Sequence, residues 1–264
     1  MSAAFRDAAG THHARAGAGA RIVCLVPSIT ELLCDLGLAS HLVGRTGFCV
    51  HPRAVVRGIP KVGGTKDVRL ELVRELEPTH VVVNVDENHL ATAEALAEFV
   101  PNVIVTHPLE PNDNLELYRL LGGIFGRDSA AERLCASFEE ALRDALASPA
   151  RAHQRVLYLI WREPWMTVAP DTYISRTLAL FDWHTVPAAP ADRYPTVDIG
   201  ALAAEVDRVL LSSEPYRFRE KHIAEVAGQV GDAAVALIDG EMTSWYGSRA
   251  IRGLRYLDEY TAAR

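Results

Sequence analysis

One uninterrupted helical pattern in the middle of the chain constrains the fold more than any other feature. Residues 128–147 contain neither glycine nor proline. Their apolar side chains recur at the spacing of one helix face: Leu134, Phe138, Ala141, Leu142 and Ala145. A helix of this length spans about 30 Å, roughly the width of a small domain. We therefore predict that it connects two separate parts of the chain.

Short apolar runs alternate with helical patterns on either side of this helix. Arg21–Val26 and His80–Val85 have the length and the β-branched residues of buried strands, and Arg155–Ile160 and Arg208–Ser212 repeat the pattern. Strands that alternate with helices form mostly parallel sheets with helices on their faces. The predicted fold is therefore α/β, with two Rossmann-like lobes joined by one long helix.

These patterns divide the chain into four predicted segments: a flexible tail over residues 1–20, an N-terminal α/β lobe over 21–125, the connecting helix over 126–149 and a C-terminal α/β lobe over 150–264. The tail is rich in alanine, glycine, histidine and arginine and lacks the apolar stretch of a secretory signal. We therefore expect a cytoplasmic protein, or a periplasmic one if a leader has been removed. Ligands commonly bind in the cleft between two lobes.

The net charge of the chain limits the kinds of molecule that we expect it to bind. The 264 residues include 27 lysines and arginines against 34 aspartates and glutamates, for a formal net charge of −7. This balance argues against nucleic acid and against anionic membrane surfaces as partners. No apolar run approaches the roughly 18 residues that a membrane span requires. We expect a monomer that takes a small-molecule ligand and does not insert into a membrane.

Motifs of common enzyme classes are missing from the sequence. Ser28 and Glu31 have the spacing of a capping box at the start of a helix, and no G-x-S-x-G pattern surrounds Ser28. Val62–Lys66 lacks the spacing of a phosphate-binding P-loop. A loop glutamate such as Glu241 could act in acid–base chemistry only within a paired geometry. We therefore predict a binding protein rather than an enzyme.

Aromatic residues gather in the segments that follow predicted strands. They form 7% of the chain, yet three of its four tryptophans occur there. The carboxyl ends of strands line the ligand crevice in open α/β sheets, and offset aromatic contacts add about 0.5–1.5 kcal/mol each, so the set suits a large, flat ligand. Packing of single rings beneath the loops is the alternative. The predicted ligand-binding residues are Phe48, His51, Trp161, Trp165, Met166, Tyr194, Glu214, Tyr216, Trp245 and Tyr246.

Several segments together resemble one known family. They are Arg21–Leu33 (R-I-V-C-L-V-P-S-I-T-E-L-L), Val62–Thr65 (V-G-G-T), Leu70–Val85, Tyr158–Thr167 (Y-L-I-W-R-E-P-W-M-T) and Asp239–Arg249 (D-G-E-M-T-S-W-Y-G-S-R). Residues 21–264 resemble the iron-siderophore/vitamin B12 class of ABC-transporter substrate-binding proteins, or helical-backbone metal receptors, and in particular its cobalamin-binding branch. The resemblance implies a fold like that of class III periplasmic binding proteins, in which two lobes clamp a metal chelate.

The resemblance also implies roles for single residues. Tyr194 matches an aromatic residue that faces the corrin ring, and Trp165 and Met166 fall on a ligand-facing loop. Glu71 matches a carboxylate that docks onto arginines of the membrane permease in periplasmic relatives. The matching position in the second lobe is Gly200, so that Asp198 is the nearest acidic residue.

The cysteines fall into two groups. None forms a C-x-x-C pair, and Cys24, Cys34 and Cys135 lie in apolar or helical patterns, so we expect them to be buried. Cys49 and His51 form a C-x-H pair on a loop and are candidate ligands of a metal ion or of the cobalt of a corrinoid. A loop cysteine beside a solvated histidine is the alternative.

The residues and the resemblance together predict non-enzymatic binding of a metal chelate for transport or salvage. The favoured ligand is a corrinoid, either cobalamin or cobinamide, and no covalent cofactor is expected. A ferric siderophore or haem is the first alternative. A bare transition-metal ion held by histidine, cysteine and carboxylate ligands is the second, since the sequence offers no clear set of three histidines. An ABC permease is the implied protein partner.

Overall fold

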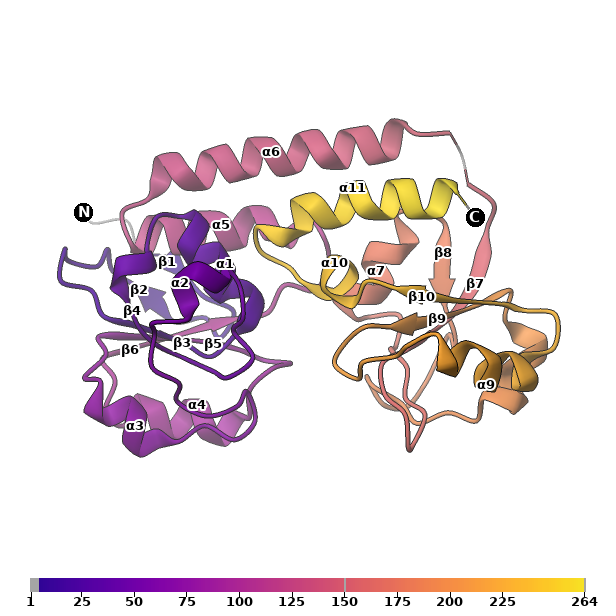
Figure 1. Ribbon diagram of the computed structural model, residues 1–264. Coiled ribbons are helices and arrows are strands. Elements are labelled where there is room, and N and C mark those ends of the chain that lie inside the picture. Colours follow the sequence, from indigo (N-terminus) through magenta and orange to yellow (C-terminus); the bar gives the residue numbers. More distant parts are fainter. Residues whose placement is uncertain (1–4, 150, 264) are drawn as a thin grey trace. The chain divides into compact units, whose positions relative to one another are not determined.

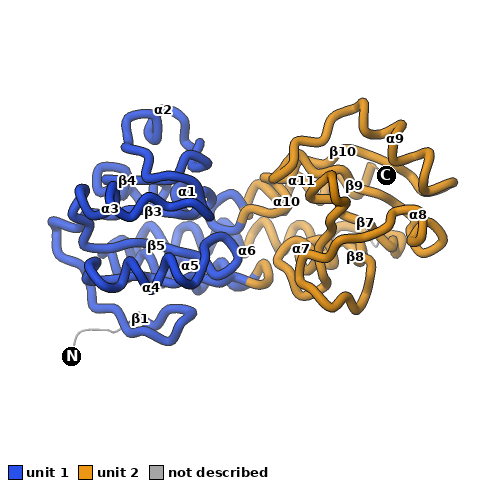
Figure 2. Tube along the Cα trace, turned by 90° about the horizontal axis from the view of Figure 1, so that it is seen from below, with its two compact units in different colours: residues 1–108, 112–138, 246–249 blue, residues 109–111, 139–245, 250–264 orange. Residues whose placement is uncertain are grey.

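The computed structural model describes residues 5–149 and 151–263 and divides the chain into two compact units (Figures 1 and 2). Unit 1 comprises residues 1–108, 112–138 and 246–249, and unit 2 comprises residues 109–111, 139–245 and 250–264. Each unit is built around its own four-stranded sheet, in which every strand pairing is parallel. The predicted α/β class with two parallel sheets is confirmed.

The sheet of unit 1 has the strand order β4-β3-β5-β6. Its strands are β3 (Ile22–Cys24), β4 (Leu42–Arg45), β5 (His80–Asn84) and β6 (Asn102–Thr106). The helices of this part of the chain are α1 (Pro27–Asp35), α2 (Arg53–Val56), α3 (Leu70–Glu75), α4 (Leu90–Ala97), α5 (Asp113–Ile124) and α6 (Asp128–Ala147), together with the 3-10 helix Ala39–His41. The bounds of α6 agree with the predicted helical pattern, and the division into units falls within this helix.

The core of unit 1 follows from the alternation of side chains along its strands. Val23, Val81 and Val83 point to one face of the sheet and pack with Val73 of α3 and Leu96 of α4, all of them 2% exposed or less. Both helices lie on that face in Figure 1. Each fully buried valine or leucine contributes about 1.5–3 kcal/mol. The sheet is thus a rigid support for the segments at its carboxyl edge.

The described residues 5–20, within the segment predicted to be a flexible tail, include a short hairpin. Strands β1 (Phe5–Arg6) and β2 (His12–His13) pair as an antiparallel hairpin. The buried Asp7 carboxylate accepts a hydrogen bond from the Val105 backbone N–H at 3.0 Å and lies 3.0 Å from His13 Nε2. This carboxylate anchors the hairpin to β6. Residues 1–4 lie outside the described part of the chain.

The start of α1 also differs from the prediction. The helix begins at Pro27, which lies in its first turn. Val26 is the N-cap residue, and its side chain makes no capping hydrogen bond. Ser28 therefore lies two positions past the N-cap and cannot act as the cap, because proline already supplies the first helical residue. Glu31 pairs instead with Arg249, at 2.7 Å from its Nε. The predicted capping box is wrong.

The sheet of unit 2 has the strand order β10-β9-β7-β8. Its strands are β7 (Gln154–Leu159), β8 (Trp183–Thr185), β9 (Arg208–Ser212) and β10 (Ala234–Ile238). The helices are α7 (Tyr173–Ala179), α8 (Ile199–Leu202), α9 (Lys221–Val230), α10 (Gly240–Ser244) and α11 (Arg249–Ala262), with the 3-10 helix Ala203–Glu205 after α8.

The core of unit 2 places α8 and α9 on one face of its sheet. Leu157 and Leu159 of β7 pack with Val209 and Leu211 of β9 and with Val226 of α9. On β7 the intervening Tyr158 is also fully buried, and its hydroxyl donates to Ser212 Oγ at 3.0 Å. The polar end of a buried tyrosine is thus satisfied at the carboxyl end of β9.

Candidate functional site

The segments that follow the strands of unit 2 carry most of the predicted ligand-binding residues. Residues 160–167 follow β7 and fold back through an antiparallel bridge between Trp161 and Met166. Met166 forms a second bridge with Thr196, two residues after Tyr194. The backbone therefore holds the half-buried Tyr194 beside the loop after β7.

Four rings from the loops after β7 and β9 form a continuous set, which we call the aromatic cluster: Trp161, Trp165, Tyr216 and Phe218. The ring centroids of Trp161 and Tyr216 are 5.7 Å apart, edge to face, and those of Tyr216 and Phe218 are 4.7 Å apart. Trp165 stacks on Phe218 with centroids 6.1 Å apart. Phe218 is 4% exposed, whereas Trp161 is 41% exposed. The cluster therefore has a buried base and an exposed indole.

A charged pair braces one side of this cluster. The Arg162 guanidinium lies over the Trp165 ring at 5.8 Å from its centroid and donates to Glu225 Oε1 of α9 at 2.9 Å. A cation over an indole face is attracted by the ring quadrupole. The loop after β7 is thus fixed to α9 as well as to the rings beneath it.

Trp245 and Tyr246 are placed differently from the aromatic cluster. Trp245 is 8% exposed and its Nε1 donates to the Glu214 carboxylate, which also accepts from Ser244 Oγ at 2.9 Å. Tyr246 is 7% exposed and belongs to unit 1. Glu214 is therefore occupied in holding an indole, and Trp245 and Tyr246 offer little ring surface to solvent in this structure.

The loop after β4 carries the candidate residues of unit 1. Phe48 is 63% exposed and Val50 is 46% exposed, whereas His51 is half-buried. A Cβ atom at Gly64 would lie 3.4 Å from the Phe48 ring, so the ring lies against the V-G-G-T segment itself. This loop therefore presents apolar surface at the carboxyl edge of its sheet, as expected for a ligand-facing segment.

Cys49 lies in the same loop but faces inward. It is fully buried, with its Sγ 3.1 Å from Thr30 Oγ1 and 3.2 Å from Thr46 Oγ1. Burial raises the pKa of this thiol, which disfavours the thiolate that binds metals. Cys24 and Cys135 are buried and Cys34 is half-buried, and none of the four forms a disulfide in the described residues.

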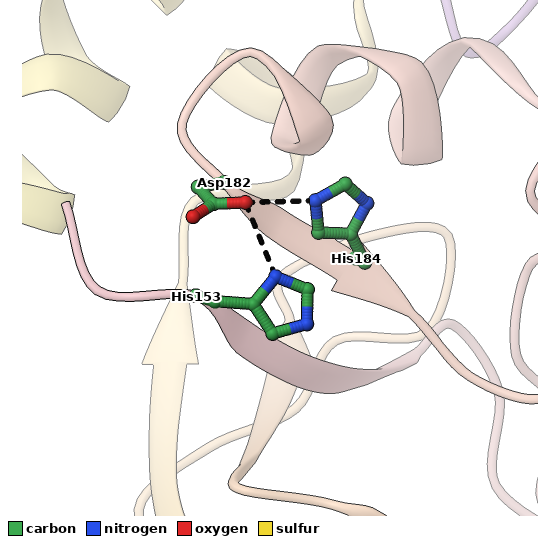
Figure 3. A group of neighbouring side chains, drawn as sticks. All are labelled: His153, Asp182 and His184. Atoms are coloured by element: carbon green, nitrogen blue, oxygen red, sulfur yellow. Dashed lines mark hydrogen bonds and ion pairs between the residues drawn. The ribbon is translucent and has the colours of Figure 1, made fainter. Parts of the chain in front are cut away.

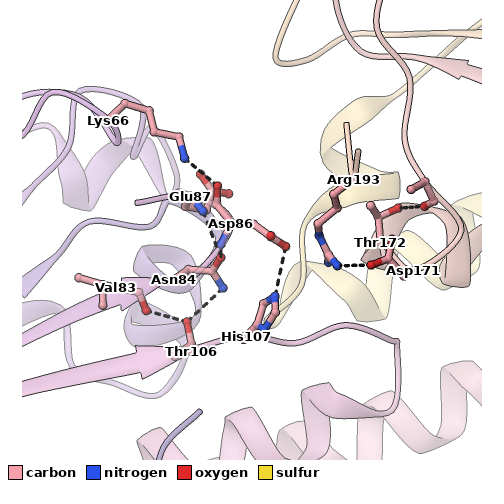
Figure 4. Close-up of polar contacts among 11 residues, drawn as sticks. Lys66, Val83, Asn84, Asp86, Glu87, Thr106, His107, Asp171, Thr172 and Arg193 are labelled. Carbon is pink, nitrogen blue, oxygen red and sulfur yellow. Dashed lines mark hydrogen bonds and ion pairs between the residues drawn. The ribbon is translucent and has the colours of Figure 1, made fainter. Parts of the chain in front are cut away.

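Sequence reasoning missed a polar group at the carboxyl ends of β5 and β6 (Figure 4). Lys66 Nζ donates to the Asp86 carbonyl oxygen at 2.9 Å, and the Asp86 carboxylate lies 3.6 Å from His107 Nε2. Asn84 Oδ1 accepts from the backbone N–H groups of Asp86 at 2.8 Å and Glu87 at 3.3 Å. Burial raises the pKa of Glu87 to about 7. The signal was available, because Asp86 and Glu87 directly follow a β-branched strand.

The residues implied in permease docking are both accessible. Glu71 is exposed in the first turn of α3. Asp198 is exposed as the N-cap of α8, where its carboxylate accepts from the Ala201 N–H at 3.2 Å. Each carboxylate thus sits at a helix start, where the helix dipole favours negative charge.

Among the residues that the structure describes, neither Cys49 nor His51 belongs to a cluster of three potential metal ligands. Within residues 5–149 and 151–263, the side chains that come close enough together to hold an ion are His153, Asp182 and His184 of unit 2. These residues lie at the opposite, amino-terminal end of β7 and β8, and their chemistry is considered below.

Two parallel sheets with apolar, aromatic loops at their carboxyl edges define a class of protein that binds solutes. Residues 22–215 match the family model described as periplasmic binding protein. The chain therefore belongs to the periplasmic binding protein family. Members of this family are solute-binding proteins rather than enzymes, so the prediction of a non-enzymatic binding protein is confirmed.

Solved structures share the fold over nearly the whole chain. The periplasmic vitamin B12 binding protein BtuF of Vibrio cholerae has a TM-score of 0.78 at 16% identity, covering 92% of this chain and 96% of its own. The periplasmic heme-binding protein RhuT from Roseiflexus sp. RS-1 has a TM-score of 0.78 at 20% identity, covering 93% and 100%. The periplasmic heme-binding protein HutB of Vibrio cholerae has a TM-score of 0.75 at 19% identity, covering 92% and 99%.

The family match, together with these shared folds, confirms the predicted resemblance to substrate-binding proteins of the siderophore and vitamin B12 class. No curated protein sequence matches the chain. Among the described residues, no helix combines the length and apolar character needed to cross a membrane.

Proposed function

We propose that this protein binds a metal chelate with a large, flat organic framework, and specifically a corrinoid such as cobalamin or cobinamide. The observation that carries the proposal is the aromatic cluster, in which Trp161 is 41% exposed while its edge-to-face contact with Tyr216 fixes its position. An indole that is both exposed and held in place loses little conformational freedom when a ring stacks on it. Its place at the carboxyl end of β7 is where ligands of parallel sheets bind.

Two further observations support a chelate as the ligand. Phe48 and Val50 expose apolar surface on the loop after β4, which suits contact with an apolar macrocycle. The BtuF structure, which shares the fold, is that of a vitamin B12 binding protein. RhuT and HutB are heme-binding proteins of the same fold, so haem is the second candidate, and a ferric siderophore or a bare metal ion follows.

A ligand panel read by calorimetry tests the proposal. The ligands are cobalamin, cobinamide, haem, a ferric siderophore, Zn²⁺ and Mn²⁺, and we expect saturable binding of a corrinoid with quenching of tryptophan fluorescence. Ligand at about one hundred times its Kd should stabilise the folded protein by about 2.7 kcal/mol. Saturation by haem or a siderophore with no response to either corrinoid would replace the proposed ligand. No saturation by any chelate would overturn chelate binding itself.

A pair of exposed-residue variants localises the binding surface. Trp161→Ala should weaken corrinoid binding by about tenfold, the equivalent of one lost stacking contact, while the unfolding temperature stays unchanged. Leu146→Ala is the matched control, because Leu146 is 58% exposed on α6 and not on a strand-end loop. Equal effects of the two variants would argue against the aromatic cluster as the binding surface.

The proposed partner is an ABC permease, and the proposed location is the periplasm, where the family normally acts. Glu71 and Asp198 are the proposed docking carboxylates. A charge-reversed Glu71→Lys, Asp198→Lys double variant should keep full corrinoid affinity and lose ligand-dependent stimulation of the permease ATPase. Loss of corrinoid affinity in that variant would show that these residues serve the ligand instead.

A further inference from the structure

Three potential metal ligands of unit 2 meet at the amino-terminal ends of β7 and β8 (Figure 3), whereas the chelate-binding loops proposed for this unit follow the carboxyl ends of its strands. His153 Nδ1 lies 3.2 Å from Asp182 Oδ1, and His184 Nε2 lies 2.9 Å from the same oxygen. All three ligand atoms fall within 4.8 Å of one another. Donors around a four-coordinate zinc ion lie about 3.3 Å apart, so small side-chain rotations bring these three into one coordination sphere.

The backbone holds the three residues in place. Asp182 has a positive φ of 58°, a conformation that aspartate tolerates better than most residues. Its N–H donates to the Ala179 carbonyl at 3.1 Å, and its own carbonyl accepts from the Gln154 N–H at 3.0 Å. Its two neighbours, Phe181 and Trp183, are 1% and 2% exposed. The backbone at Asp182 is thus held by two hydrogen bonds and flanked by two buried aromatic residues.

The histidines are fixed by strand pairing. His184 lies in β8 opposite Arg155 of β7, and His153 directly precedes β7. The two imidazole rings stack with their centroids 4.8 Å apart and an interplanar angle of 28°. This arrangement directs one nitrogen of each ring to Asp182. The three side chains therefore lose little conformational entropy when an ion replaces the hydrogen bonds to Asp182.

The donor set selects a class of ion. Two imidazole nitrogens and one carboxylate oxygen suit Zn²⁺, Ni²⁺ or Cu²⁺ better than Mg²⁺ or Ca²⁺, which prefer oxygen ligands. One oxygen of Asp182 already lies within hydrogen-bonding distance of a nitrogen of each imidazole ring. The nearby charges of Arg155 and Asp207 pair with each other at 2.8 Å. The side chains are about half exposed, which leaves room for water to complete the coordination.

We propose that His153, Asp182 and His184 form a binding site for a divalent transition-metal ion, separate from the chelate-binding loops of the same unit. Strand β7 separates this metal site from the chelate-binding loop at its other end. It has six residues and spans about 20 Å. β8 is the edge strand of its sheet and has three residues. A bound ion would tie this short edge strand and the turn after α7 to β7, so metal occupancy would stabilise unit 2.

Titration of the chelator-treated full chain with Zn²⁺ tests this site. Calorimetry near neutral pH should show one ion bound per chain, and the unfolding temperature should rise with Zn²⁺ concentration. Co²⁺ in place of Zn²⁺ should give visible absorption bands that report nitrogen and oxygen ligands. Absence of saturable binding of both ions would overturn the proposal.

Single substitutions assign the ligands. His153→Gln, His184→Gln and Asp182→Asn should each weaken Zn²⁺ binding by about tenfold or more. The control is His89→Gln, since His89 is also exposed, and it should bind as the wild type does. A loss in His51→Gln, with His184→Gln unaffected, would move the ion to the loop after β4 and refute the site. Corrinoid affinity should be unchanged in His184→Gln, so failure of this proposal is distinct from failure of the proposed function.

Discussion

Glu87 is a carboxyl group whose environment moves its pKa toward neutrality. Burial raises its pKa to about 7 from an ordinary value of 4.5, although Lys66 acts in the opposite direction. In the unfolded chain the group ionises near the ordinary value. The folded state therefore keeps a proton that the unfolded state releases between these two values, and stability contributed by this group is lost as the pH rises through the window.

Glu87→Gln should remove this pH dependence. The variant should match the wild type at low pH, where both side chains are neutral, and be more stable than the wild type above pH 7. Thermal unfolding across the window measures the difference. Glu71→Gln is the control, because it removes the same charge from an exposed position. Parallel profiles for Glu87→Gln and the wild type would contradict the raised pKa.

The cysteines give a second residue-scale prediction. Cys49 and Cys24 are fully buried and burial raises the pKa of each thiol, whereas Cys34 is half-buried with its pKa raised to about 11. A thiol reagent should therefore label the folded protein slowly and at Cys34 first. Cys34→Ser should remove most of that slow reaction, while denaturant should release all four thiols of the wild type. Rapid labelling of Cys49 in the folded protein would restore it as a candidate metal ligand.

The placement of single site residues could be predicted from sequence only where they lie on exposed loops. Phe48 and Trp161 follow strands and remain exposed, in keeping with their predicted surroundings. Trp245 has the same kind of position but is buried, because Glu214, thirty-one positions earlier, accepts a hydrogen bond from its indole. No local sequence pattern indicates a hydrogen-bond partner that lies thirty-one positions away. The role of each candidate residue in ligand binding stays a prediction.

At the scale of elements, α11 packs on α10 so closely that one glycine is required. A Cβ atom at Gly253 would lie 2.3 Å from the backbone carbonyl oxygen of Met242. Gly253→Ala must therefore separate the two helices and should destabilise the protein by about 1–3 kcal/mol. Gly228→Ala in α9 is the control, since nothing lies within 4 Å of the added atom and alanine favours a helix by about 1 kcal/mol. Urea denaturation should show opposite signs for the two variants.

The elements with the clearest periodicity were also the most predictable. The helical pattern over residues 128–147 became α6 with the same bounds. Shorter elements carry weaker patterns: β8 has three residues, too few to show alternation, and α9 begins at Lys221, three residues after the buried Phe218. The hairpin of β1 and β2 depends on the Asp7 carboxylate reaching Val105, which composition cannot reveal.

At the scale of the whole chain, unit 1 is completed by a segment from near the carboxyl terminus. Residues 246–249 belong to it, although the chain between them and residue 138 builds unit 2. Gly247 N–H donates to Asn114 Oδ1 at 2.6 Å, and Tyr118 Oη donates to the Gly247 carbonyl at 2.9 Å. The returning segment is thus hydrogen-bonded to α5, and unit 1 cannot reach its full stability from its amino-terminal residues alone.

Variants of the buried ion pair between Glu31 and Arg249 should measure how much the returning segment contributes to the free energy of unfolding. Its side chains are 7% and 4% exposed, and two hydrogen bonds of 2.7 and 2.9 Å join residues 218 positions apart. Glu31→Gln leaves the guanidinium buried without its counter-charge and should cost about 3–5 kcal/mol. Glu31→Leu combined with Arg249→Met removes both charges, so it should recover much of that loss.

Urea denaturation of these variants distinguishes a structural pair from an incidental one. The control is Glu132→Gln, which breaks an exposed pair with Arg119 and should change stability little, because solvent screens such pairs. If Glu31→Gln were as mild as the control, the pair would not secure the segment 246–249. If the double variant were no better than Glu31→Gln, the loss would come from packing around α1 and not from the unpaired charge of Arg249. Recovery in the double variant would show that the loss in Glu31→Gln comes from the unpaired guanidinium of Arg249, because apolar packing can then replace the ion pair.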